Sequence, residues 1–201
     1  TGSSPDRAMT GSARADTMPA AATPSAFDQC LTLRMEQDAT ALAGGLFRES
    51  FGMDFPTPRP IRFGTVQTLP ADWRQAVALY RWPDGREECV GFANWIKFRN
   101  VYLGGALCVK SDFYRRLPRD QYRECRRRGG IAQIVMEFGD RMLTDCDGWF
   151  GYCGDTKAFR VDSRVGFVAT RHPLIIAKWV KPLPEAQKNA LIDEVATVGP
   201  F

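Results

Sequence analysis

Three consecutive stretches of strand-forming residues, separated by very short turns, constrain the fold of this chain more than any other feature. They are rich in β-branched and aromatic residues, and they cover residues 75–82, 88–98 and 101–109. The turn sequence Pro83-Asp84-Gly85 separates the first two, and Asn100 marks the second turn. The first pair is therefore predicted to be an antiparallel hairpin, and the third stretch to continue the sheet. The paired glycines Gly104-Gly105 in the third stretch predict a bulge or a close backbone approach.

Helical and strand patterns alternate on both sides of this central sheet. A strand over residues 30–35 and a helix over 38–50 precede it. After it, the pattern predicts a helix over 131–142, a strand over 149–153, a helix over 156–164, strands over 168–170 and 174–180, and a closing helix over 184–195. The order β-α-β-β-β-α-β-α-β-β with a C-terminal helix predicts the α/β (α+β) class, a mixed sheet with helices on its faces.

The ends and loops of the chain are also predictable in outline. Residues 1–26 are rich in Ala, Thr, Ser, Gly and Pro and are expected to form a flexible tail, because they lack large apolar groups to bury. Residues 27–201 are expected to form one domain. Residues 55–60 read as a proline-stiffened loop, and a short element is expected after Pro70.

Composition excludes several classes of protein. The net charge of +4 is too mild for a protein that coats nucleic acid, so nucleic acid is not an expected partner. The sequence lacks an apolar run of about 18 residues, so no membrane association is expected. The six cysteines form no Cys-x-x-Cys pair, and the single histidine, His172, cannot complete a usual zinc set, so no metal is expected. The cysteines are interpreted as reduced thiols in a cytoplasmic protein.

The segment Arg127-Arg128-Gly129-Gly130-Ile131-Ala132 lies where the loop after the third central strand becomes a helix. Glycines at a helix start leave backbone N–H groups uncovered, and the helix N-terminus carries a partial positive charge. The segment therefore predicts a site for a phosphate-type anion. It also closes an arginine-rich stretch, which contains Arg115, Arg116, Arg119, Arg123, Arg126, Arg127 and Arg128.

These motifs, in this order of elements, resemble the GCN5-related N-acetyltransferase (GNAT) superfamily. The central motif of that family is a strand, then Arg/Gln-x-x-Gly-x-Gly/Ala, then a helix, and Arg127-x-x-Gly130-x-Ala132 matches it. A second hallmark is a short strand, a helix and a Gly-Phe pair, found here as residues 149–153, 156–164 and Gly166-Phe167. The resemblance covers roughly residues 30–182 and rests mainly on the order of elements.

The resemblance implies acetyl-CoA or another acyl-CoA as donor and a small-molecule or peptide amine as acceptor. The pyrophosphate would lie against the backbone of residues 128–132, which are Arg128, Gly129, Gly130, Ile131 and Ala132, with Arg127 at the family position. Leu107 and Val109, near the end of the preceding strand, would contact the pantetheine arm. The acyl thioester would lie where two parallel strands part, and the amine would attack it directly.

Three residues are candidates for the chemistry. Tyr152 either protonates the leaving thiolate or packs in the fold, and Cys153 is either a buried packing residue or a covalent acyl carrier. His172 is either structural or a general base, since its ordinary pKa near 6.5 suits that work. Many family members place a tyrosine four residues before the Gly-Phe pair, where this chain has Asp162. Asp162 is expected to cap or decorate a helix, or to bind the ammonium of the acceptor.

The insertion at residues 110–126, which most relatives lack, keeps other hypotheses open. Its arginines could form a solvated helix face, bind coenzyme A phosphates or dock an acidic partner. Acyl carrier protein, bound through the region from Arg115 to Arg128, would make the chain a carrier-dependent N-acyl synthase of the same fold. A non-catalytic module that binds coenzyme A or an acidic partner is the remaining alternative, and a homodimer is compatible with any of these.

Overall fold

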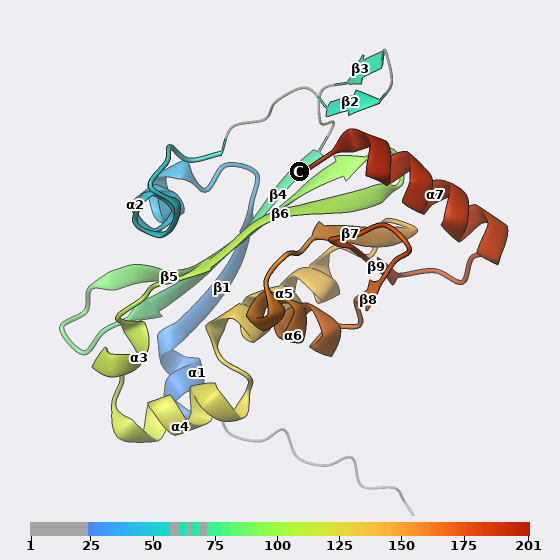
Figure 1. Ribbon diagram of the computed structural model, residues 1–201. Helices are drawn as coiled ribbons and strands as arrows, with labels where there is room; N and C mark the ends of the chain where they lie inside the picture. Colours follow the sequence, from blue (N-terminus) through green and yellow to red (C-terminus); the bar gives the residue numbers. More distant parts are fainter. Residues whose placement is uncertain (1–23, 57–60, 64–65, 69–71) are drawn as a thin grey trace, which may run out of the picture.

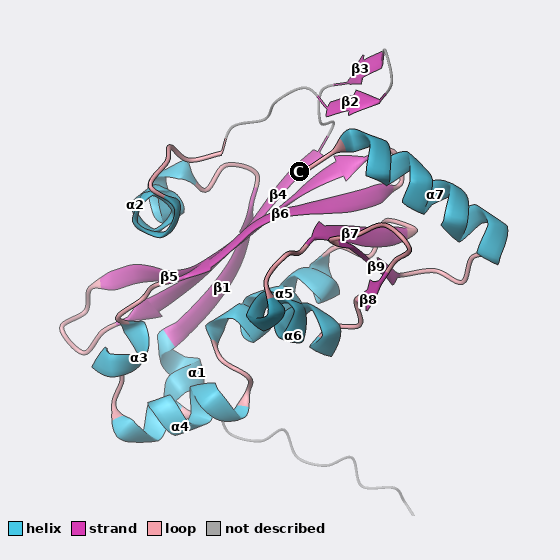
Figure 2. Ribbon diagram, viewed as in Figure 1, coloured by secondary structure: helices cyan, strands magenta, loops and turns pink. Residues whose placement is uncertain are grey.

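The computed structural model describes residues 24–56, 61–63, 66–68 and 72–201 (Figure 1). The helices are α1 (Ala26–Cys30), α2 (Thr40–Phe51), α3 (Phe113–Arg116), α4 (Arg119–Arg127), α5 (Ile131–Met142), α6 (Thr156–Arg164) and α7 (Glu185–Val198). The strands are β1 (Leu31–Glu36), β2 (Ile61–Phe63), β3 (Val66–Thr68), β4 (Asp72–Arg81), β5 (Glu87–Phe98), β6 (Val101–Val109), β7 (Gly148–Tyr152), β8 (Val168–Ala169) and β9 (Ile175–Trp179). Figure 2 distinguishes the helices from the strands and shows helices packed around a central sheet.

A seven-stranded mixed sheet organises the described residues, in the order β1-β4-β5-β6-β7-β9-β8. Strands β4, β5 and β6 are antiparallel neighbours, which confirms the prediction from the short turns. The pair β6–β7 is parallel, and the other neighbours in the sheet are antiparallel. The predicted mixed α/β class is confirmed.

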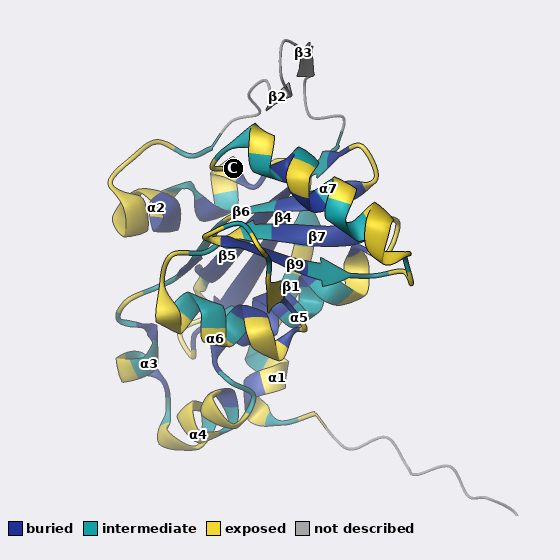
Figure 3. Cartoon of the chain, turned by 45° about the vertical axis from the view of Figure 1, so that its right-hand side comes forward, coloured by how far each residue is buried: buried dark blue, intermediate teal, exposed yellow. Residues whose placement is uncertain are grey.

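Helices cover both faces of the sheet, as the burial colouring in Figure 3 makes visible. Successive residues of β4 contribute to opposite faces of the sheet, because the side chains of a strand point alternately to its two sides. Ala76 and Ala78 belong to the apolar core that includes α5, whereas Val77 and Leu79 pack with α2. Residues of α7 join a third core cluster with the ends of β5 and β6. Helices α2 and α7 therefore share the face opposite α5.

A bulge interrupts the β5–β6 ladder where the paired glycines predicted one. The register shifts between Ala93 and Trp95, and the side chain of Asn94 fills the gap. The Ala106 N–H donates a hydrogen bond of 2.7 Å to Asn94 Oδ1, in place of a ladder bond. A Cβ atom on Gly105 would lie only 2.6 Å from Asn94 Nδ2, so glycine is required for this close approach.

The structure differs from the sequence prediction in two places, before β1 and between α2 and β4. Helix α1 was not predicted and begins inside the segment assigned to the tail; Ser25 and Asp28 form a capping box that starts it. Residues 1–23 of the predicted tail lie outside the described residues, as do residues 57–60 of the proline loop and residues 69–71. The short antiparallel pair β2–β3 was also not predicted.

The remaining element boundaries agree closely with the prediction. Asp155 caps α6, and its carboxylate accepts hydrogen bonds of 2.8 Å from the N–H groups of Lys157 and Ala158. The insertion, for which the sequence predicted no element, forms α3 and α4. Within the described part of the chain, no helix combines the length and apolar character needed to cross a membrane.

Candidate functional site

Strands β6 and β7 run side by side for a few residues and then part. Their parallel register extends from Val101 opposite Gly148 to Gly104 opposite Gly151. Strand β6 continues to Val109, paired with β5 on its other edge. No described strand pairs with the β7-facing edge of β6 beyond Gly104. Such an edge presents free backbone N–H and C=O groups, which can bind an extended ligand as an added strand would.

A cavity of about 200 Å³, which we call the splay cavity, lies where these strands part. Its walls come from β5, β6, β7, α5 and α6. Three of the residues singled out in the sequence, Leu107, Tyr152 and Cys153, line it, and Asp162 lines it as well. Val109 does not; it packs instead against the core beneath α5.

Asp162 and Cys153 meet in the splay cavity, and burial governs the acid–base character of both. Asp162 is only 9% exposed, and this burial raises the pKa of its carboxyl although a hydrogen bond with Cys153 opposes the shift. Burial likewise raises the pKa of the Cys153 thiol. A raised thiol pKa disfavours the thiolate that a covalent acyl carrier would need. A raised carboxyl pKa favours a group that holds a proton, so burial suits Asp162 to a proton-holding role and disfavours a thiolate at Cys153.

Of the other two chemical candidates, Tyr152 also lines the splay cavity, whereas His172 does not. Tyr152 is 41% exposed, and its ring centroid lies 6.3 Å from that of Phe201. His172 lies between β8 and β9, and its Nε2 is 2.8 Å from Asp193 Oδ1 on α7. It is not among the residues that line the splay cavity, so the structure does not bring His172 to the other candidates.

The glycine-rich turn between α4 and α5 is tighter than the sequence suggested. Gly129 and Gly130 have φ values of +85° and +90°, which favour glycine. The N–H groups of residues 128, 129 and 130 donate to carbonyls of α4. The N–H of Ile131 donates to the Tyr114 hydroxyl at 3.0 Å. Within the predicted cradle at 128–132, only the N–H group of Ala132 has no hydrogen-bond partner in the described part of the chain. The N–H group of the next residue, Gln133, has no partner there either.

A second cavity, of about 410 Å³, lies beside this turn, and we call it the arginine cavity. It is lined by Arg126, Arg127, Arg128, Gly129, Gln133, Glu137 and Arg164. The side chain of Arg127 is 73% exposed and pairs with Glu124, and Arg128 pairs with Asp28. Arg126 and Arg164 have no carboxylate partner among the described residues. The guanidinium groups that are free to bind an anion in this cavity therefore belong to Arg126 and Arg164, and not to Arg127 of the motif predicted from the sequence.

Arg164 reaches the turn from α6, far along the chain. A Cβ atom on Gly129 would lie 3.6 Å from Arg164 Nη1. Gln133 lies at the same place, and its buried Oε1 has no hydrogen-bond partner among the described residues. Sequence reasoning missed Arg164 because it is isolated in sequence from the arginine-rich insertion. Two unpaired guanidinium groups and two free helix N–H groups form a site suited to an anion with several oxygens.

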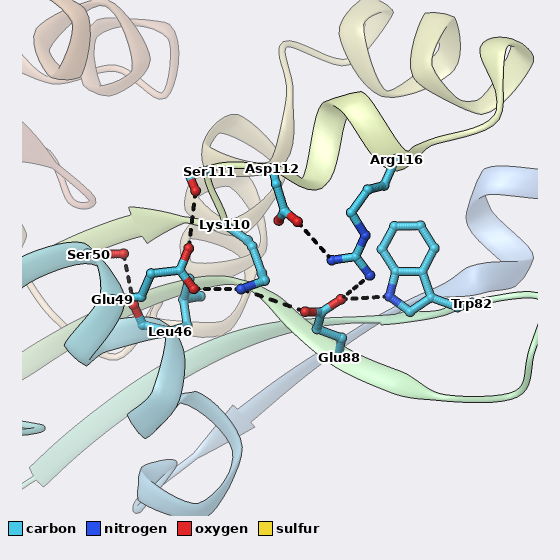
Figure 4. Close-up of polar contacts among 9 residues, drawn as sticks. All are labelled: Leu46, Glu49, Ser50, Trp82, Glu88, Lys110, Ser111, Asp112 and Arg116. Carbon is cyan, nitrogen blue, oxygen red and sulfur yellow. Dashed lines mark hydrogen bonds and ion pairs between the residues drawn. The ribbon is translucent and has the colours of Figure 1, made fainter.

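The insertion is held against the rest of the molecule by an ion-pair network, drawn in Figure 4. Lys110 Nζ lies 2.6 Å from Glu49 on α2 and 3.7 Å from Glu88 on β5. Arg116 on α3 lies 2.7 Å from the same Glu88, and the guanidinium carbon stands 4.0 Å from the centroid of the Trp82 ring. Trp82 Nε1 donates to Glu88 at 2.8 Å. The network fixes the position of α3, and hence of Tyr114, whose hydroxyl accepts a hydrogen bond from Ile131 at the start of α5.

Comparisons with known proteins give the following. No protein-family model matches the sequence, and no curated protein matches it either. Among solved structures, the S18-alanine N-acetyltransferase of Escherichia coli is 13% identical, with 77% of this chain and 97% of that chain covered and a TM-score of 0.45. The PaiA N-acetyltransferase of Thermoplasma acidophilum, in complex with coenzyme A, is 13% identical, with 54% and 61% covered and a TM-score of 0.39. GCN5 of Tetrahymena is 12% identical, with 55% and 71% covered and a TM-score of 0.36.

The topology agrees with the resemblance stated from the sequence. One parallel strand pair stands in an otherwise antiparallel central sheet, and it parts beside a helix that begins at a glycine-rich turn. The chain has a mixed α/β fold with a seven-stranded sheet, the class that the sequence predicted.

Proposed function

We propose that this chain is an N-acyltransferase, which transfers an acetyl or longer acyl group from a coenzyme A thioester to an amine. One observation carries the proposal: the splay cavity and the arginine cavity lie along the same two helices, α5 and α6. The first opens on an unpaired strand edge, and the second gathers positive charge at a helix N-terminus. An extended molecule with an amide-bearing arm and several phosphates suits such a pair of sites.

The residues present fit a coenzyme A thioester. Its phosphates would lie against Arg126, Arg164 and the N–H groups of Ala132 and Gln133. The amides of its arm would pair with the free edge of β6 around Leu107, and its thioester would lie in the splay cavity. When bound, the thioester supplies an acyl group activated toward attack by an amine.

In the proposed chemistry, the amine nitrogen forms a bond to the acyl carbon as the carbon–sulfur bond breaks. The departing thiolate needs a proton, and the amine loses one. Asp162 holds a proton more tightly than an ordinary carboxyl does, because burial raises its pKa, so it suits the role of acid toward the sulfur. Tyr152, which also lines the cavity, is the alternative acid. This step requires neither a covalent intermediate on Cys153 nor a metal.

Titration of coenzyme A and acetyl-CoA into the protein, followed by calorimetry, tests the proposal. Arg164→Gln should weaken binding by roughly 10-fold or more, since it removes charge-assisted hydrogen bonds to phosphate. Arg86→Gln is the matched control, because Arg86 lies in the exposed β4–β5 turn beside Asp84, away from both cavities. If the wild-type protein binds neither ligand, the proposed function is wrong.

A carrier-protein donor remains a second candidate, supported by one specific observation. The outer side of the insertion carries a surface cavity lined by Tyr114, Arg115, Leu117, Arg119 and Tyr122. Its apolar and basic residues would suit an acidic carrier, and Tyr114 connects it to the start of α5. Arg115→Glu should reduce transfer from acyl carrier protein and leave transfer from acyl-CoA unchanged. Tight coenzyme A binding without transfer to any amine would instead favour a non-catalytic binding module.

A further inference from the structure

Arg128 connects the arginine cavity to the N-terminal helix α1, which packs against α4 (Figure 1). It lines the cavity from the C-terminal end of α4, and its Nη1 is paired with the carboxylate of Asp28 on α1. The carbon of its guanidinium group also lies 5.9 Å from the centroid of the Phe27 ring. A basic side chain of the proposed phosphate site is therefore held by an acidic group of the protein itself.

Packing fixes Asp28 in this position. The preceding residue, Phe27, is completely buried, and its ring centroid lies 6.3 Å from that of Tyr80. Ser25 and Asp28 form the capping box of α1, in which the Ser25 hydroxyl donates a hydrogen bond of 2.8 Å to the Asp28 carboxylate. Moving α1 away would expose the Phe27 ring to water. The carboxylate therefore stays beside α4, and the long side chain of Arg128 is the part that can change its partner.

From these contacts we infer that Asp28 is an internal competitor, which the phosphate groups of a ligand displace from Arg128. It thereby limits the affinity of the arginine cavity for anions with several phosphate oxygens, such as pyrophosphate and the phosphate-bearing end of coenzyme A. The inference rests on the proposed function, since it takes the arginine cavity as the phosphate site. It adds a residue on α1 that regulates how tightly the donor is held.

The exposure and charge of the pair favour such an exchange. The side chains of Arg128 and Asp28 are 30% and 39% exposed, and an ion pair this accessible to water contributes little to stability. Hydrogen bonds with Ser25, together with the charge of Arg128, lower the pKa of Asp28, so its carboxylate is ionised at neutral pH. A phosphate offers more charge and more acceptor oxygens to a guanidinium than a carboxylate does. Asp28 therefore opposes binding in two ways, because it occupies Arg128 and repels the ligand.

Calorimetric titration of inorganic pyrophosphate into the wild-type protein and Asp28→Asn tests the inference. Asparagine removes the charge but keeps an oxygen that can accept the hydrogen bonds of Ser25, so the cap of α1 is retained. We expect the Kd for pyrophosphate to fall roughly 3- to 10-fold, since one competing ion pair and one repulsive charge are removed. A Kd that stays the same or rises would overturn the inference.

Asp38→Asn is the matched control, because it changes the net charge of the protein by the same amount. Asp38 is also an exposed carboxylate at the start of a helix, where it accepts a hydrogen bond of 2.9 Å from the Thr40 N–H. It precedes α2, on the face of the sheet opposite α5, so its substitution should leave the Kd for pyrophosphate unchanged. Equal tightening in the two variants would reveal a general effect of net charge and would contradict the role given to Asp28.

A double-mutant cycle with Arg128→Gln locates the effect. Glutamine leaves Asp28 without a guanidinium to hold, so the gain from Asp28→Asn should shrink to about 2-fold or less in this background. If Asp28→Asn tightens pyrophosphate binding equally with and without the guanidinium of Arg128, the carboxylate does not act through Arg128 and the inference is wrong.

Titration of coenzyme A into the same proteins separates this inference from the proposed function. If pyrophosphate binds as expected but no coenzyme A species does, the proposed function fails and Asp28 still regulates an anion site. If coenzyme A binds and Asp28→Asn changes the Kd of neither ligand, the inference fails and the proposed function stands. Absence of pyrophosphate binding to both the wild-type protein and Asp28→Asn also overturns the inference.

Discussion

At the scale of single residues, Asp162 is the candidate whose surroundings best suit it to acid–base chemistry. From its sequence neighbours it is an ordinary polar residue near the end of a helix. In the structure it is buried, it lines the splay cavity, and its pKa is raised by that burial. The resemblance noted in the sequence places it where many members of that family have a tyrosine, so in the proposed function a carboxyl group would replace a phenol as proton donor.

Asp162→Asn should separate catalysis from stability. We expect kcat to fall by roughly 100-fold, the lower end of the range for loss of an acid–base group, with the Kd for coenzyme A unchanged. Because the pKa of Asp162 is raised in the folded state, ionisation destabilises the fold as pH rises through that pKa. The variant should therefore have a higher Tm than the wild-type protein at pH 7, and the difference should disappear below about pH 3, where the carboxyl is neutral in both states. Thermal melts across this range, with steady-state rates, provide the measurement.

At the scale of elements, the packing of α5 on the sheet positions the proposed donor site. The helix lies directly over Trp95 of β5, whose ring packs at a tilt against that of Trp149, with centroids 5.5 Å apart. Gly139 permits the close approach, because a Cβ atom there would lie 2.6 Å from Trp95 Cη2. The Trp95 ring is fully buried, so it has little room to move. The start of α5, and therefore the anion site, depends on this contact.

Gly139→Ala tests that dependence through two opposing effects. Alanine favours a helix by about 1 kcal/mol over glycine, but overpacking a rigid core costs about 1–3 kcal/mol. We expect the clash to win, so that the free energy of unfolding falls by roughly 1–2 kcal/mol. In Gly45→Ala, on α2, a Cβ atom would meet nothing within 4 Å, so this variant should gain up to about 1 kcal/mol. Urea denaturation of both variants measures the effect; equal stabilisation of the two would contradict the packing argument.

At the scale of the whole molecule, the ion-pair network of Figure 4 joins three regions that are distant in sequence. Lys110 and Arg116 of the insertion converge on Glu88 of the β4–β5 hairpin, and Lys110 also pairs with Glu49 of α2. Burial alone would raise the pKa of Glu88. Hydrogen bonds from Arg116 and Trp82, together with the charges of Arg116 and Lys110, outweigh burial, so its pKa is lowered.

Glu88→Gln should therefore weaken the fold in a pH-dependent way. A carboxyl whose pKa is lowered by folding adds stability above its ordinary pKa of 4.5, and this stability is lost as the pH falls through the folded value. We expect the variant to be less stable than the wild-type protein by about 1.5–3 kcal/mol at pH 7, the usual contribution of hydrogen bonds to a charged group. The two stabilities should converge near pH 3. A constant difference from pH 7 to pH 3 in denaturation experiments would show that the charge of Glu88 is not responsible.

Much of the fold could be predicted from the sequence, because local patterns determine local structure. Runs of β-branched and aromatic residues predicted β4, β5 and β6, and the glycines at 104 and 105 predicted the bulge or close backbone approach found there. Helix α1 was missed because its capping box lies at the edge of a segment with few apolar residues. The pair β2–β3 was missed because each strand is only three residues long.

The sequence by itself determined most of the elements, their order and the turn at Gly129-Gly130, since each depends on residues that are neighbours in the chain. The tertiary structure alone decided which side chains surround the candidate site. It brought Arg164 to the α4–α5 turn and buried Asp162. It also placed the Tyr114 hydroxyl at the Ile131 N–H and paired His172 with Asp193 on α7. These contacts join residues far apart in sequence, and their energies depend on how helices pack on the sheet, which no local pattern encodes.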